Sequence, residues 1–159
     1  MNTFKAEMAE IAPVIKEVVD GGGNFTLGVT GISMCPLFWE NRDSVILSKP
    51  DKIKKFDIIL YKRSNGHFVL HRIVKIKNNI YSLCGDNQNV IEYPIYPEQV
   101  IAKVIGFIRK GKVYKTSDFI YKLYVFIWGH TLKCRKFMMR SYFYLSTRVK
   151  KILNYFKKH

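Results

Sequence analysis

Cysteine is scarce in this sequence, and its three copies stand far apart. Cys35, Cys84 and Cys134 form no Cys-x-x-Cys pair, and no histidines cluster around them in the sequence. This spacing predicts neither a zinc site nor a disulfide framework, and a reducing compartment is the simpler interpretation. We therefore expect a protein that needs no metal and no other cofactor.

Long apolar runs are missing as well. Residues 1–23 carry three glutamates among their apolar residues and lack a basic start followed by an apolar run, so they do not form a typical secretory signal. Residues 119–129 are apolar and aromatic but shorter than the roughly 20 residues that a bilayer span needs. The sequence predicts a cytoplasmic protein and leaves peripheral binding to the inner face of the cell membrane open.

Acidic residues are nearly missing from the last third of the chain. The formal net charge is +15, but residues 1–106 hold 13 Lys/Arg against 11 Asp/Glu, whereas residues 107–159 hold 14 against one. The tail, residues 117–159, also carries an apolar stripe at helical spacing, formed by Met138, Tyr142, Leu145, Val149, Ile152 and Phe156. Basic amphipathic helices bind anionic lipid surfaces, so we expect the tail to lie on a membrane or on a partner.

The rest of the chain predicts a β-rich domain over residues 1–116. Residues 4–20 have the apolar spacing of one helix, and residues 24–116 are dominated by short β-branched runs. Three turns are expected between antiparallel strands, at Asn65-Gly66, Asn78-Asn79 and Lys110-Gly111. The expected fold class is mainly β (β-rich α+β), an antiparallel body with an N-terminal helix and a basic helical tail.

Three short motifs in this body contain residues that can do chemistry. Ser33 lies in "GISMCPLF", a stretch that taken alone is equally typical of a strand ending in a turn. His71 lies in the apolar strand "FVLHRIV", where it is either a satisfied core residue or a general base. His67 is about 13 Å away along an extended strand, which argues against a two-histidine metal site. Asp86, in "CGDNQN", is most simply a turn residue.

The order of these motifs, Gly-x-Ser-Met-x-Pro, His-Arg-Ile and Gly-Asp-Asn over residues 24–108, resembles the type I signal peptidase and LexA-like peptidase superfamily. The histidine version is similar to the signal peptidases of the endoplasmic reticulum and of sporulation. The resemblance implies a serine endopeptidase that cleaves a peptide or protein precursor, and a LexA/signal-peptidase-like β body. It assigns the nucleophile, the base and the acid to Ser33, His71 and Asp86, and oxyanion or supporting roles to Gly31, Met34 and Arg72.

Several features depart from that resemblance and keep alternatives open. Gly31 stands where signal peptidases commonly have a serine, the family's second acidic residue has only a loose counterpart in Glu92, and no membrane anchor is evident. One alternative is a LexA-like DNA-binding regulator, although a single acidic N-terminal helix is too little for a helix-turn-helix, so nucleic acid is not the expected partner. Another is a non-catalytic membrane-surface module with a relic site.

Overall fold

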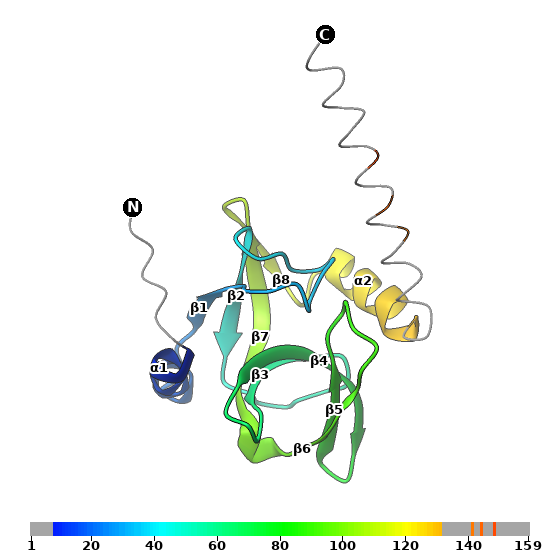
Figure 1. Ribbon diagram of the computed structural model, residues 1–159. Helices are drawn as coiled ribbons and strands as arrows, with labels where there is room; N and C mark the ends of the chain where they lie inside the picture. The colour runs from blue at the N-terminus through cyan, green and yellow to red at the C-terminus, as the bar shows by residue number, and fades with distance from the viewer. Residues whose placement is uncertain (1–7, 132–140, 142–143, 145–147, 149–159) are drawn as a thin grey trace.

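The computed structural model describes residues 8–131 and, in the tail, the single positions 141, 144 and 148. It consists of one antiparallel sheet with a helix at each end of the described chain (Figure 1). The expected start of the first helix at residue 4 and the apolar stripe expected between Met138 and Phe156 lie outside these residues. The helix that is described, α1, spans Met8–Asp20.

Eight strands form the sheet, in the order β1-β2-β7-β3-β4-β5-β6, with β8 paired to β7. All of the pairs are antiparallel, which confirms the predicted β-rich fold class. The strands are β1 Phe25–Gly28, β2 Asp43–Ser48, β3 Ile58–Lys62, β4 Phe68–Lys77, β5 Ile80–Cys84, β6 Glu92–Ile95, β7 Val100–Arg109 and β8 Lys112–Lys115.

The three predicted turns lie where the sequence placed them. Gly66 adopts a φ of 87° between β3 and β4, Asn78 and Asn79 have φ of 49° and 59° between β4 and β5, and Lys110 and Gly111 have φ of 49° and 76° between β7 and β8. Asparagine and glycine reach such positive φ values most easily, which is why these dipeptides are good hairpin signals. Neither β6 nor the short 3-10 helix η1 that follows it, Pro97–Gln99, was expected from the sequence.

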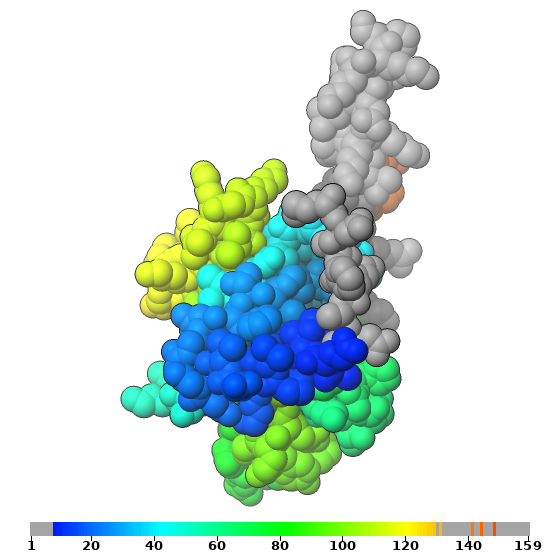
Figure 2. All heavy atoms as spheres, turned by 90° about the vertical axis from the view of Figure 1, so that its left-hand side faces the viewer, coloured from blue at the N-terminus to red at the C-terminus, as the bar shows by residue number. Residues whose placement is uncertain are grey.

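The helix α1 closes one side of the sheet. Its apolar stripe places Ala12, Ile15 and Val19 in the main core, which includes residues of β2, β3 and β7. Figure 2 faces this side and shows α1 as the dark blue segment lying on the body. Three consecutive glycines follow α1, and Gly22 takes a φ of 83° that ends the helix before β1.

The second helix, α2, spans Phe119–His130 and follows β8 directly. Its inner face packs on the body: Trp128 is 6% exposed and lies in a small apolar cluster with Cys35, Trp39 and Tyr124. The division between body and tail at residue 116 stays a prediction, but α2 is physically joined to the body. In the described part of the chain, no helix is long and apolar enough to cross a bilayer.

Candidate active site

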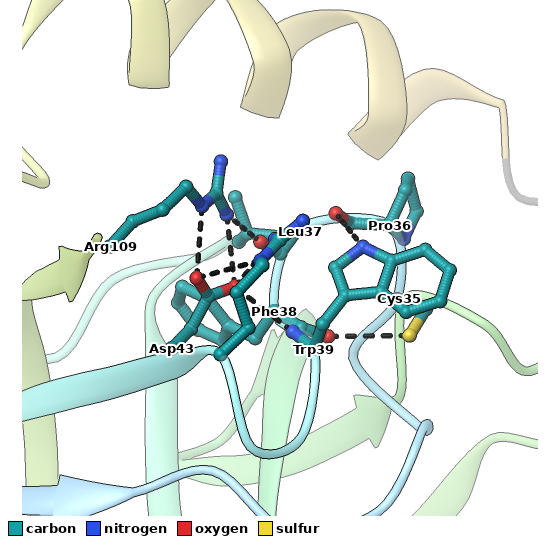
Figure 3. A network of polar contacts seen from close by, with 8 residues as sticks. Cys35, Pro36, Leu37, Phe38, Trp39, Asp43 and Arg109 are labelled. Atoms are coloured by element: carbon teal, nitrogen blue, oxygen red, sulfur yellow. Dashed lines mark hydrogen bonds and ion pairs between the residues drawn. The ribbon is translucent and has the colours of Figure 1, made fainter. Parts of the chain in front are cut away.

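The loop that carries Ser33 is tied to the sheet by a buried carboxylate. Asp43, at the start of β2, accepts hydrogen bonds from the Trp39 amide (3.0 Å) and from Nε of Arg109 (3.0 Å), and Arg109 also donates to the Leu37 carbonyl (Figure 3). Burial raises the pKa of Asp43, but hydrogen bonds from Arg42 and Arg109 outweigh burial and lower the pKa to about 2. Residues 33–43 are therefore a fixed loop with a charged anchor.

A second loop, after β5, lies against the first. The Asn87 amide donates to the Ser33 carbonyl at 2.8 Å, and the Asn87 side chain donates to the Ile32 carbonyl at 3.3 Å. Gly85 permits this approach, because a Cβ at that position would lie 2.6 Å from the Ser33 oxygen. The Gly-Asp-Asn motif thus positions the backbone of the serine motif, although Asn87 and Ile32 are 55 residues apart in the sequence.

The amide groups beside Ser33 form a candidate oxyanion site. In the part of the chain that the structure describes, the backbone N–H groups of Ser33 and Met34 have no hydrogen-bond acceptor. The Gly31 N–H, by contrast, donates to Glu40 at 3.0 Å. Gly31 has a φ of 75°, which turns the chain before the serine, and Met34 is buried in the core at 2% exposed. Gly31 and the Met34 side chain therefore shape the loop. The adjacent backbone N–H groups of Ser33 and Met34 are candidate donors to a developing oxyanion.

His71 is buried in the middle of β4, only 1% exposed, and one of its ring nitrogens is close to a carboxylate. Nδ1 of His71 lies 3.1 Å from Oε1 of Glu92 and 3.4 Å from the Tyr61 hydroxyl. Burial lowers the pKa of His71, and the opposing effect of Glu92 is too small to restore it. The imidazole is therefore neutral near neutral pH, as a general base must be.

The carboxylate of Glu92 is held in its ionised form. It accepts a hydrogen bond from the Tyr61 hydroxyl at 2.7 Å and two from the Arg63 guanidinium. Burial alone would raise the pKa of Glu92. The hydrogen bonds from Arg63 and Tyr61 together have the larger effect, so the pKa lies below its usual value. An ionised Glu92 next to Nδ1 favours the tautomer with the proton on Nδ1, which leaves the lone pair of Nε2 free to accept a proton.

The structure places Asp86 differently from the expectation that it orients His71. Asp86 is fully buried and receives paired hydrogen bonds from Arg72, from Nε at 2.8 Å and from Nη2 at 2.7 Å. Tyr124 of α2 donates to the same carboxylate at 3.0 Å, and Trp128 donates to the Asp86 carbonyl at 3.0 Å. The geometry favours Glu92 as the orienting acid and gives Asp86 and Arg72 a supporting position beneath the serine loop. The catalytic role of Asp86 stays a prediction.

Ser33 and His71 come together in one cavity of about 740 Å³. Within residues 8–131 no hydrogen bond joins the two side chains, an arrangement that is frequent in enzymes without substrate. Thr30 and Gln88 supply polar groups beside Ser33. The remainder of the lining is mostly apolar and includes Met8, Ile11, Leu27, Val29, Phe68 and Leu70.

Cysteines and metals contribute little to this region. Cys35 and Cys84 are both buried, and burial raises the pKa of Cys35, which disfavours its thiolate. No group of three or more His, Cys, Asp or Glu side chains that could hold a metal ion occurs among the described residues. Among these groups, the serine and histidine of the shared cavity therefore fit nucleophilic chemistry best.

Neither a scan against models of protein families nor a search of curated proteins found a match for this chain. The assignment of function therefore depends on the site itself.

Glu92 was expected only as a loose counterpart of the family's second acidic residue, and Tyr61 and Arg63 were not expected at the site. Glu92 lies in "VIEYPIY", where nothing in the sequence marks it as a partner of a histidine 21 residues earlier. The face of Tyr61 depends on the hairpin register: a two-residue turn at Asn65-Gly66 would pair Leu60 with His71, whereas the observed register pairs Ile59 with His71. A shift of one residue moves every side chain to the other face, so the Asn-Gly dipeptide alone did not place Tyr61 beside His71.

Proposed function

We propose that the protein is a serine endopeptidase in which Ser33 is the nucleophile, His71 the general base and Glu92 the orienting acid. The observation that carries the proposal is that Ser33 and His71 line one cavity while Glu92 contacts Nδ1 of His71, which leaves Nε2 to act as the base. The resemblance of the motif order to signal peptidase and LexA-like enzymes supports the same reaction. Its substrate would be a peptide or a protein precursor.

The proposed reaction follows from the positions of these groups. Nε2 of His71 removes the hydroxyl proton as Oγ of Ser33 attacks the scissile carbonyl carbon. The amides of Ser33 and Met34 donate to the oxyanion, and the imidazolium then protonates the leaving amine. This leaves an acyl group on Ser33, and a water molecule activated by His71 hydrolyses the ester to return the free serine.

The sheet edge beside the cavity supports a peptide as the substrate. β1 is the terminal strand of the sheet order, paired with β2 on one side, and its Leu27 and Gly28 line the cavity. An extended peptide can add to such an edge through main-chain hydrogen bonds, with alternate side chains entering the apolar cavity. The same edge geometry would place a scissile bond next to Ser33.

Mapping of new peptide N-termini tests the proposal. The full chain and its Ser33→Ala variant are compared in the source cells and, purified, on a peptide library made by digesting a proteome. We expect new termini with the wild type and none of these termini with Ser33→Ala. Ser64→Ala, a change in an exposed hairpin turn, is the control and should give the same termini as the wild type. His71→Gln should reduce cleavage by about 10³-fold or more. Identical termini in all four samples would rule out peptidase activity at this site.

We also propose that the protein binds an anionic membrane surface through α2 and the tail. Almost all of α2 is apolar, whereas a helix with only one buried face normally has a polar opposite face. Its outward residues are exposed, among them Phe119 (78%), Ile120 (80%) and Phe126 (66%). Lys122, also exposed, and the basic composition of residues 107–159 add attraction to acidic headgroups.

Vesicle flotation tests the membrane proposal. We expect the full chain to float with vesicles that contain phosphatidylserine and to float less with phosphatidylcholine alone. Phe119→Ser/Phe126→Ser should lose flotation, whereas Val14→Ser/Val90→Ser, which changes exposed apolar residues elsewhere, should keep it. Equal flotation of both double variants would contradict a role for α2, and equal binding to both vesicle types would contradict the role of charge.

A further inference from the structure

Glu92 is held by two side chains from one neighbouring hairpin strand. Tyr61 lies in β3 and is fully buried, and Arg63 follows the last residue of β3. The Tyr61 hydroxyl and Nε of Arg63 both donate to Oε2, at 2.7 Å each, and Nη2 of Arg63 donates to Oε1. Oε1 is also the oxygen that lies 3.1 Å from Nδ1 of His71. Both carboxylate oxygens are thus engaged, and the plane of the carboxylate is fixed.

The strand that carries Glu92 cannot fix the carboxylate by itself. β6 has four residues, forms the other end of the sheet order, and contains Pro94, which lacks an N–H. Its pairing with β5 is irregular between the partners of Tyr81 and Leu83. A short edge strand of this kind is held weakly by its main chain, so a planar guanidinium that binds both oxygens adds the missing restraint.

We propose that Arg63 and Tyr61 are positioning residues that hold Glu92 in the geometry where its carboxylate accepts the Nδ1 proton of His71. Neither side chain needs to touch the substrate for this role. The catalytic role that this inference gives to Arg63 and Tyr61 rests on the proposed function. The geometry of the four side chains can, however, be tested without any substrate.

Arg63 has an electrostatic effect in addition to its effect on geometry. Burial lowers the pKa of His71 most, Glu92 raises it, Arg63 lowers it and Asp86 raises it. Loss of the Arg63 charge alone would raise the pKa of His71, whereas release of Glu92 from Nδ1 would lower it, and the effect of Glu92 is the larger of the two. Other charged and titratable groups also face or flank His71. Those that contact it or affect its pKa directly are Tyr61, Arg63, Glu92 and Asp86. Arg72 is the next residue along β4, and Arg42 and Asp43 line the same cavity.

NMR titration of the imidazole tests the proposal on the full chain. The His71 resonance is assigned by comparison with His71→Gln, and its pKa is measured in Arg63→Gln and in the matched control Lys62→Gln. Lys62 is adjacent to Arg63 in sequence, and Lys62→Gln removes the same charge. Its ammonium group lies over the Phe68 ring, whereas the Arg63 guanidinium binds Glu92. We expect the pKa to fall by about half a unit or more in Arg63→Gln, because a released Glu92 withdraws the larger effect, and to stay within error in Lys62→Gln. The acidic limb of kcat/KM should move by the same amount.

Tyr61→Phe and Arg63→Lys separate positioning from folding. Tyr61→Phe keeps the ring, so it should preserve the melting temperature better than it preserves activity, and kcat should fall with little change in KM. Arg63→Lys keeps the charge without the fork and should restore most of the His71 titration but only part of kcat. A raised or unchanged His71 pKa in Arg63→Gln would overturn the inference, even with an active enzyme, because Glu92 would then keep its place without Arg63. A lowered pKa in a protein without peptidase activity would instead reject the proposed function alone.

Discussion

Gly85 lies directly against the main chain of Ser33. A Cβ on residue 85 would be 2.6 Å from the Ser33 carbonyl oxygen and about as close to the Gln88 side chain, at 3.0 Å. A contact of 2.6 Å with a backbone atom cannot be relieved by rotating a side chain. The glycine of the Gly-Asp-Asn motif is therefore required by the distance between two loops, and the φ of Gly85 is not in the left-handed region.

Gly85→Ala should push the serine loop away from the loop after β5. We expect a loss of about 1–3 kcal/mol in the free energy of unfolding, as for overpacked cores, and a larger proportional loss of kcat because Ser33 is displaced. Urea unfolding and peptide cleavage measure the two effects. Gly28→Ala is the matched stability control, since a Cβ at residue 28 meets nothing within 4 Å. Equal stability of the two variants would show that the loops separate without cost.

The two carboxylates near the site should respond differently to amide substitution. Asp86→Asn leaves Arg72, which is 0% exposed, without its countercharge. Removing one partner of a buried ion pair typically costs about 3–5 kcal/mol, so Asp86→Asn should lower the free energy of unfolding by that order. Glu92→Gln should lower kcat strongly, because the Nδ1 proton loses its anionic acceptor, and should destabilise the fold less.

Urea unfolding combined with initial rates distinguishes these outcomes. A stable Asp86→Asn variant with kcat reduced as much as in His71→Gln would assign the catalytic acid to Asp86 and remove Glu92 from that role. The pair of variants is matched, because each replaces a buried or part-buried carboxylate near the site by its isosteric amide, Asp86 after β5 and Glu92 at the start of β6. An effect on stability in one and on rate in the other is the pattern that the contacts predict.

The anchor of the serine loop should make stability sensitive to strong acid. The folded pKa of Asp43, about 2, is below the value of 3.8 for a free carboxyl. A depressed folded pKa means that the stabilisation is present above pH 3.8 and is lost as the pH falls through about 2. Asp43→Asn should thus be less stable than the wild type at pH 6, and the difference should shrink between pH 4 and pH 2.

Thermal unfolding over that pH range provides the measurement. Asp20→Asn is a suitable control, because its ion pair with Lys16 is on the exposed face of α1 and exposed pairs contribute little to stability. A difference between Asp43→Asn and the wild type that is independent of pH would contradict the charged anchor and leave only the hydrogen bonds.

The body of the fold was predictable where its signals are local. The hairpins at Asn78-Asn79 and Lys110-Gly111 are two-residue turns in which both residues have a positive φ. The hairpin at Asn65-Gly66 has a loop one residue longer, in which Arg63 bonds to His67 and Gly66 has the positive φ. The strand order was not predictable, because β7 pairs with both β2 and β3 across long stretches of sequence. β6 was missed because Pro94 makes its sequence atypical of a strand.

The site was predictable in its residues and less so in its contacts. The motif order selected Ser33 and His71, which line one cavity. It did not separate the two acids, since Asp86 follows β5 directly whereas Glu92 comes six residues later, after a loop whose path the sequence does not specify. The partner of Asp86 is Arg72, the residue next to His71, whose side chain alternates to the opposite face of β4. This alternation along β4 could have suggested that His71 and Arg72 each have a separate carboxylate partner.

A final prediction concerns where the chain can be shortened. Tyr121 of α2 lies within hydrogen-bond distance of Arg72 (3.3 Å), and Tyr124 and Trp128 bond to Asp86. Deleting residues 117–159 would expose the buried Arg72–Asp86 pair and the Cys35 cluster, so we expect this form to unfold at much lower urea or to be insoluble. A chain ending at Thr131 keeps α2 and should unfold cooperatively near the midpoint of the full chain. Urea unfolding of both forms, followed by circular dichroism, makes the comparison. Equal midpoints would show that the body ends at residue 116 and that the contacts of α2 contribute nothing to its stability.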